Sequence, residues 1–82
     1  YRYRDLDGLE VDIVAEFPDG QLLAIEVKSR RTVTEQSWSA LERFRNRYPD
    51  RKTTGIVLHG GTQVAHLHGW LHVLPMRSLW DH

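Results

Sequence analysis

Two stretches with alternating side-chain character, separated by a tight turn, constrain this 82-residue chain more than any other feature. Residues 10–17 and 22–28 each follow period two, which indicates β-strands. Between them lies Pro18-Asp19-Gly20. Proline presets φ at the first turn position, and glycine accepts the left-handed conformation at the third. The sequence therefore predicts a β-hairpin over residues 10–28.

The turn also predicts the register of this hairpin. A three-residue loop with Gly20 in the left-handed region pairs Phe17 with Gln21. A two-residue loop would mix apolar and polar positions on both faces, and such a slip is forbidden wherever one face is buried. The three-residue loop places Asp12 opposite Glu26. By the same rule, it pairs Glu10 with Lys28, Val14 with Ala24, Ile13 with Ile25, and Val11 with Val27.

Two facing carboxylates destabilise a sheet unless something neutralises them. A divalent cation would do so, because Mg²⁺ prefers oxygen ligands and commonly combines one or two carboxylates with water and substrate phosphate. Lys28 follows Glu26 on the same face, where its ammonium could activate a water or stabilise charge on phosphorus. The alternative is a salt-bridge ladder, which would contribute only about 0–1 kcal/mol if exposed. The pattern favours a phosphodiesterase-type site of Asp12, Glu26 and Lys28 with Mg²⁺ or Mn²⁺. Glu10 could support the ligands, although the register favours it as the partner of Lys28.

The rest of the chain predicts one helix and further strands. Thr32 and Glu35 have capping-box spacing, the apolar residues that follow recur with helical period, and Pro49 ends the helix near Tyr48. A strand–helix–strand order predicts a crossover that sets residues 53–59 parallel to residues 22–28. We also expect a first strand at Tyr1–Asp5, a closing hairpin of Gln63–Leu67 and Leu71–Leu74, and a helical turn at Met76–Trp80. Trp38, Phe44 and Tyr48 are expected in the core.

Composition narrows the class of protein. The chain has no cysteine, so disulfides and thiolate metal sites are excluded, and a cytoplasmic location is expected. No apolar run reaches the roughly 20 residues that span a bilayer. Residues 1–27 hold seven acids and two bases, whereas residues 28–52 hold eight bases and three acids. This segregation suits a cation site beside an anionic polymer, although two solvated faces are the simpler interpretation of charge alone. The length indicates one domain, residues 1–82, which we interpret as part of a longer protein.

The order Glu10-Val11-Asp12, hairpin, Glu26-Val27-Lys28 and helix resembles the PD-(D/E)XK nuclease superfamily. The wider run is similar to nuclease-like C-terminal domains of prokaryotic AAA+ type ATPases. Its matching segments are Tyr3-Arg4-Asp5, Ile25-Glu26-Val27-Lys28, Gly55-Ile56-Val57-Leu58 and Leu74-Pro75…Leu79-Trp80. The resemblance implies an α/β restriction-endonuclease-like mixed sheet: antiparallel hairpin, crossover helix, parallel strand and closing hairpin. The family often adds a glutamate from an N-terminal helix that this chain lacks, and position 11 is valine rather than proline.

Carried over by residue, the resemblance makes Asp12 and Glu26 metal ligands and Lys28 the catalytic lysine. The implied function is hydrolysis of phosphodiester bonds in DNA with Mg²⁺ or Mn²⁺, in a domain attached to an ATPase. No Gly-rich phosphate loop occurs, so ATPase activity would belong to other sequence. The implied partners are DNA, the rest of the parent chain and a possible second copy, with no membrane. The alternative is an inactive nuclease-fold module for DNA binding, docking or oligomerisation.

Several other residues have both a functional and an ordinary interpretation. The segment after the lysine could hold phosphate or be a solvated strand end: Ser29, Arg30 and Arg31. Gln36 could contact substrate, and a DNA-facing stripe could form from Arg43, Arg45, Arg47, Arg51 and Lys52; solvated faces are favoured for both. A zinc site at His66, His68 and His72 lacks local acids and cysteines, so ordinary hairpin residues are favoured. Trp70 and Trp80 could be exposed, and in that case they could mark contact with the remainder of the protein.

Overall fold

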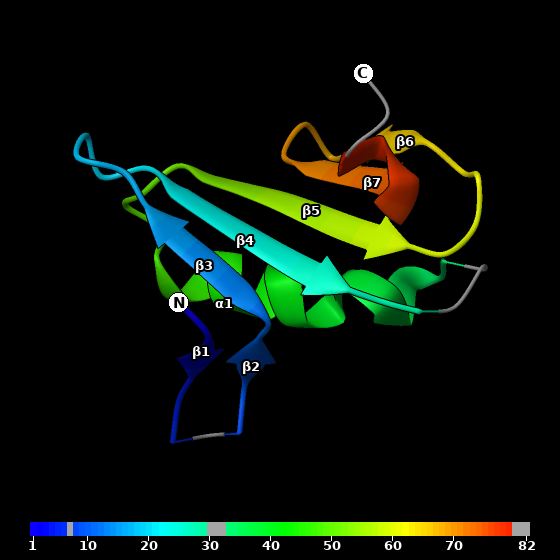
Figure 1. Cartoon of the computed structure of the whole chain (residues 1–82). Helices are drawn as coiled ribbons and strands as arrows, with labels where there is room; N and C mark the ends of the chain where they lie inside the picture. The colour runs from blue at the N-terminus through cyan, green and yellow to red at the C-terminus, as the bar shows by residue number, and fades with distance from the viewer. Residues whose placement is uncertain (7, 30–32, 80–82) are drawn as a thin grey trace.

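The computed structural model describes residues 1–6, 8–29 and 33–79, and its centre is a five-stranded mixed sheet of order β3-β4-β5-β7-β6 (Figure 1). The strands are β3 (Ile13–Glu16), β4 (Leu22–Val27), β5 (Thr53–His59), β6 (Ala65–Leu67) and β7 (Leu71–Pro75). β4, β5 and β7 run parallel, while β3 and β6 lie antiparallel at the two edges. These pairings confirm the expected α/β class. They also confirm the parallel pairing of the two strands that the helix connects, β4 and β5, and the closing β6–β7 pair.

The β3–β4 hairpin has the register that its turn predicts. Ile13 pairs with Ile25, and Val14 pairs with Ala24. The Phe17 backbone N–H donates to the Gln21 carbonyl at 2.9 Å, which closes a loop with Gly20 at φ 92°. A side chain at Gly20 would be strained at this positive φ, so the glycine fixes the loop length and therefore the register.

The strand expected over residues 10–17 is not continuous. It breaks at Asp12, and β2 (Glu10–Val11) leaves the large sheet to pair with β1 (Tyr3–Arg4) in a separate two-stranded ribbon. The expected pairs of Val11 with Val27 and of Glu10 with Lys28 are therefore wrong. The β1 strand offers Val11 a backbone partner in Tyr3, and Val11 becomes fully buried there.

The helical segment begins as a 3₁₀ turn, η1 (Glu35–Trp38), and continues as α1 (Ser39–Arg47). The Thr34 N–H donates to the Ser37 hydroxyl at 3.1 Å, so the cap forms at Thr34. The expected cap at Thr32 lies outside the described residues.

Helix α1 crosses one face of the sheet, and the core lies between them (Figure 1). Phe44 is buried as expected, while Trp38 and Tyr48 are half-buried against the core. The buried cluster contains Leu9, Val11, Val14, Leu22, Ala24, Leu41, Phe44, Val57, Leu71 and Val73. Because α1 packs on the face that carries Ala24, it also covers the next inward position on β4, which is Glu26.

The opposite face of the sheet is open only in part within the described ranges, since Leu58 on it is buried. Ile13 and Val27 are 45% and 42% exposed there. A second 3₁₀ turn, η2 (Met76–Leu79), follows β7, in agreement with the expected helical turn. Within the described ranges, no helix has the length and apolar character needed to cross a membrane.

Candidate metal centre

The break in the strand at Asp12 fixes its carboxylate beside Glu26. The Asp12 backbone N–H donates to Glu26 Oε1 at 3.3 Å, and the Val27 backbone N–H donates to Asp12 Oδ2 at 2.9 Å. Each acid therefore accepts a hydrogen bond from the backbone of the opposite strand. This mutual pattern replaces ordinary strand pairing with side-chain contacts and holds the two acidic side chains at one point.

Glu26 is almost fully buried, with 6% of its surface exposed. Burial raises its pKa first, the nearby Asp12 charge raises it further, and Lys28 partly opposes both. Lys28 Nζ lies 3.4 Å from Glu26 Oε2. The structure therefore brings the three predicted site residues together, and the charge of Glu26 is only partly neutralised.

Lys28 is positioned by the parallel strand next to β4. Its backbone N–H donates to the Leu58 carbonyl at 2.7 Å, so the chain stays attached to the sheet one residue beyond β4. The side chain is 38% exposed and reaches solvent at this end of the sheet. An ammonium in this position can approach a substrate anion without losing its contact with Glu26.

Glu10 does not have its expected role as the partner of Lys28. The Arg4 Nε–H donates to Glu10 Oε1 at 2.7 Å across the β1–β2 ribbon. Aromatic packing anchors this ribbon to the helix. The ring of Tyr3 on β1 meets the ring of Phe44 on α1 edge-to-face, at 4.8 Å between centroids. Glu10 still lines the same depression as the acidic pair, so it can influence the site without ligating.

Arg43, which the sequence offered only as part of a DNA-facing stripe, also lines this depression. The open depression has a volume of about 420 Å³, and α1 contributes Ala40 and Arg43 to its wall, opposite Asp12 and Glu26. Arg43 is exposed and has no ion-pair partner among the residues that the structure describes. Its spacing of three residues from Ala40 places both on one side of the helix, which is the signal that could have identified it.

The other candidates are not gathered at this site. Ser29 is exposed just after β4, and Arg30 and Arg31 lie outside the described residues. Gln36 lines a separate depression between η1 and the β6–β7 turn. Of the remaining basic residues, Arg47 pairs with Asp5 and Arg51 pairs with Glu16.

The three histidines do not form a zinc centre. His66 and His72 pack edge-to-face at 4.2 Å between ring centroids, and His68 lies in the following turn at φ 56°. The described residues contain no group of three or more His, Cys, Asp or Glu side chains that could hold a metal.

The acidic pair fits Mg²⁺ or Mn²⁺ better than it fits zinc. Structural zinc sites close four protein ligands around the ion, whereas Mg²⁺ is held by one or two carboxylates together with water and phosphate. Asp12 Oδ1 accepts no hydrogen bond from a described residue, and burial together with the Asp12 charge raises the pKa of Glu26, which a bound cation would oppose. Asp12 and Glu26 would therefore be the two protein ligands.

The fold and this site define a small α/β domain with a candidate two-carboxylate cation centre at the end of a parallel strand. A protein-family model described as "Domain of unknown function (DUF4143)" matches residues 1–79, so the chain belongs to that family. No curated protein and no solved structure matches the chain.

Proposed function

We propose that this domain is a metal-dependent nuclease that hydrolyses phosphodiester bonds in DNA at the site of Asp12, Glu26 and Lys28. The observation that carries the proposal is the pair of reciprocal backbone hydrogen bonds that hold two carboxylates together, with Lys28 Nζ 3.4 Å from one of them. A purely structural role explains this arrangement poorly, because burying Glu26 beside a like charge raises the free energy of the folded state.

Each residue then has a distinct role. Asp12 and Glu26 would hold the cation, which supplies Lewis-acid polarisation of the phosphate and lowers the pKa of water when it is bound. Lys28 would orient the attacking water or stabilise the charge that develops on phosphorus. Arg43, from the opposite wall of the depression, would bind a non-bridging phosphate oxygen, since guanidinium suits that geometry.

The proposed substrate is DNA because the site joins cationic groups to an open surface. Lys28 and the exposed Arg43 flank the acids, and the depression is shallow rather than enclosed. Such a shape admits a polymer backbone more readily than it retains a small molecule.

We further propose that the sheet is a restriction-endonuclease-like core of the PD-(D/E)XK type and that the domain is joined to an ATPase. The order of β3, β4, α1 and β5, with the acids and the lysine on the first two strands, supports this assignment. An inactive DNA-binding or docking module remains the alternative function.

The test is cleavage of supercoiled plasmid DNA with Mg²⁺ or Mn²⁺. We expect nicking that stops with a chelator and falls by at least about 100-fold in Asp12→Asn, Glu26→Gln and Lys28→Met. Glu42→Gln, an exposed acid on α1, is the control and should cleave normally. Cleavage that continues in Asp12→Asn at the wild-type rate would refute the assignment. Metal binding without cleavage of duplex, branched or single-stranded DNA would favour the inactive module.

A further inference from the structure

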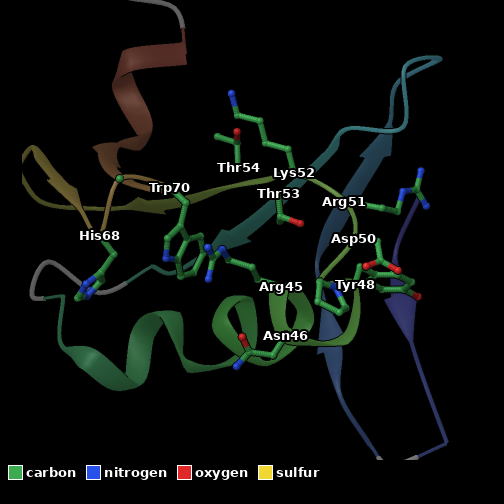
Figure 2. Close-up of a pocket in the computed structure, with 12 residues that line it drawn as sticks. Arg45, Asn46, Tyr48, Asp50, Arg51, Lys52, Thr53, Thr54, His68 and Trp70 are labelled. Carbon is green, nitrogen blue, oxygen red and sulfur yellow. The ribbon is translucent and has the colours of Figure 1, made fainter.

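A larger cleft lies at the other end of the sheet, away from the acidic pair (Figure 2). It has a volume of about 550 Å³ and is bordered by the end of α1, the loop from α1 to β5, and the β6–β7 turn. Thr53, which lines this cleft, pairs with Leu22, and Leu22 lies four positions before Glu26 on β4. At about 3.3 Å per residue, the cleft and the metal centre are about 13 Å apart along the strand.

The cationic side chain of Arg45 is held in place inside this cleft. The Arg45 guanidinium carbon lies over the Trp70 ring, 5.1 Å from its centroid (Figure 2). Trp70 is itself fixed against Gly55, where a methyl group would come within 2.7 Å of its ring. No carboxylate among the described residues pairs with Arg45. Its guanidinium is thus pre-oriented by stacking, with N–H groups left to bind an anion.

A buried hydroxyl faces the same space. Thr53 is only 4% exposed, and its Oγ1 has no hydrogen-bond partner among the residues that the structure describes. Figure 2 shows Thr53 at the start of β5, between Arg45 and Asp50, with its hydroxyl turned to the side of Asp50. A buried, unpaired hydroxyl costs stability, and a ligand atom that accepted its hydrogen bond would remove this cost.

The remaining charges make the cleft a site for an anion. Lys52 is exposed at its rim, while the neighbouring Arg51 is already occupied by Glu16 and by the Gly20 carbonyl at 2.6 and 2.8 Å. Asp50 is the one carboxylate on the described wall. The negative end of the α1 dipole opposes an anion here, but the basic residues of the last turn offset it.

We propose that this cleft binds a phosphate group, either of a free nucleotide or of a nucleic-acid backbone. Arg45 would donate two N–H groups to the phosphate, Thr53 would donate its hydroxyl, and Lys52 would contribute charge from the rim. The site is separate from the metal centre, and it does not depend on hydrolysis there.

The test is a two-dimensional NMR titration of the full chain without metal and with a chelator, using three probes. These are inorganic phosphate, thymidine 5′-monophosphate, and a short oligothymidylate without a terminal phosphate. We expect saturable shifts of the Thr53 and Thr54 amides and of the Trp70 indole N–H. Tighter binding of the monophosphate assigns the site to nucleotides, and tighter binding of the oligomer assigns it to nucleic acid.

Two variants and a matched control decide the result. Thr53→Val keeps the shape of the side chain, so it should weaken binding about tenfold while the melting temperature is unchanged or raised. Arg45→Gln should weaken binding at least tenfold. Arg77→Gln makes the same charge change at an exposed position on η2, outside the cleft and the metal centre, and should change affinity less than twofold. The absence of saturable shifts, or equal losses in Arg45→Gln and Arg77→Gln, would overturn the proposal.

Discussion

Replacing Asp12 with asparagine should stabilise the protein without metal and at the same time abolish its stabilisation by Mn²⁺. Asparagine keeps a side-chain oxygen for the Val27 N–H, and the backbone N–H of residue 12 can still donate to Glu26. The substitution therefore removes one negative charge and leaves both hydrogen bonds in place.

The size of the effect follows from the facing geometry. Two charges about 5 Å apart repel by about 3 kcal/mol at an effective dielectric of 20, and by about 1 kcal/mol in water. Lys28 offsets part of this repulsion from 3.4 Å, so the lower end applies. A gain of about 1 kcal/mol raises the melting temperature of a domain of this size by about 4–8 °C.

Metal should reverse the order of the melting temperatures, so that the wild type melts above Asp12→Asn. A cation at 100 times its dissociation constant stabilises the folded state by about 2.7 kcal/mol, and this increment requires both carboxylates. Thermal unfolding followed by circular dichroism, with a chelator or with Mn²⁺, measures both states. Glu42→Gln is the control and should not gain stability without metal. The reasoning fails if Asp12→Asn melts at or below the wild type without metal, or if both respond equally to Mn²⁺.

Three further predictions concern titration and packing. Burial and the Asp12 charge raise the pKa of Glu26 above its ordinary value of 4.5, and a metal must displace the proton of this carboxyl. Mn²⁺ affinity measured by calorimetry should therefore fall as the pH is lowered through a range above 4.5. A pH dependence that begins only below 4.5 would contradict the raised pKa. The hydrogen bond between the Tyr3 and Tyr48 hydroxyls, followed by burial, raises the pKa of Tyr3 to about 12 from 10.0. The unfolded chain therefore ionises first, and urea-measured stability should decline between about pH 10 and 12. Tyr3→Phe should remove this decline, and an unchanged profile would refute the cause. Gly55→Ala places a methyl group 2.7 Å from Trp70 Cζ3, so the free energy of unfolding, measured by urea denaturation, should fall by about 1–3 kcal/mol. An unchanged urea midpoint would show that the Trp70 ring can move aside without cost.

The parts of the fold that depend on local sequence were predictable. Pro18-Asp19-Gly20 determines the loop, the loop determines the register, and the register brings Asp12 to Glu26. The position of Lys28 then follows from strand period alone. Each step involves neighbours within a single hairpin, so no knowledge of the remaining chain was needed.

The break at Asp12 could not be predicted in the same way. It exists because residues 10–11 pair with β1 and because Tyr3 packs against Phe44, which lies far along the chain. A period-two pattern is compatible with both a continuous and a broken strand. The wrong partner for Glu10 followed directly from this error, since Arg4 becomes its neighbour only when the β1–β2 ribbon forms.

The sequence named Arg43 and Arg45 only as members of one DNA-facing stripe, for which a solvated face was favoured, and it did not assign them to two different sites. Helical period shows which residues are apolar, but the angle at which α1 crosses the sheet decides that Arg43 faces the acids and Arg45 faces Trp70. The sequence allowed Trp70 to be exposed, and the structure has it half-buried because Gly55 leaves room for its ring on the adjacent strand. A glycine inside a strand signals such a close approach without naming the partner.

The most direct test of the metal centre is a crystal soaked with Mn²⁺ and measured at a wavelength where manganese scatters anomalously. An ion shared by the Asp12 and Glu26 carboxylates, with Lys28 beside it, is the predicted result. Well-diffracting crystals that show no anomalous peak between those two side chains, or a peak bound only elsewhere, would contradict the assignment.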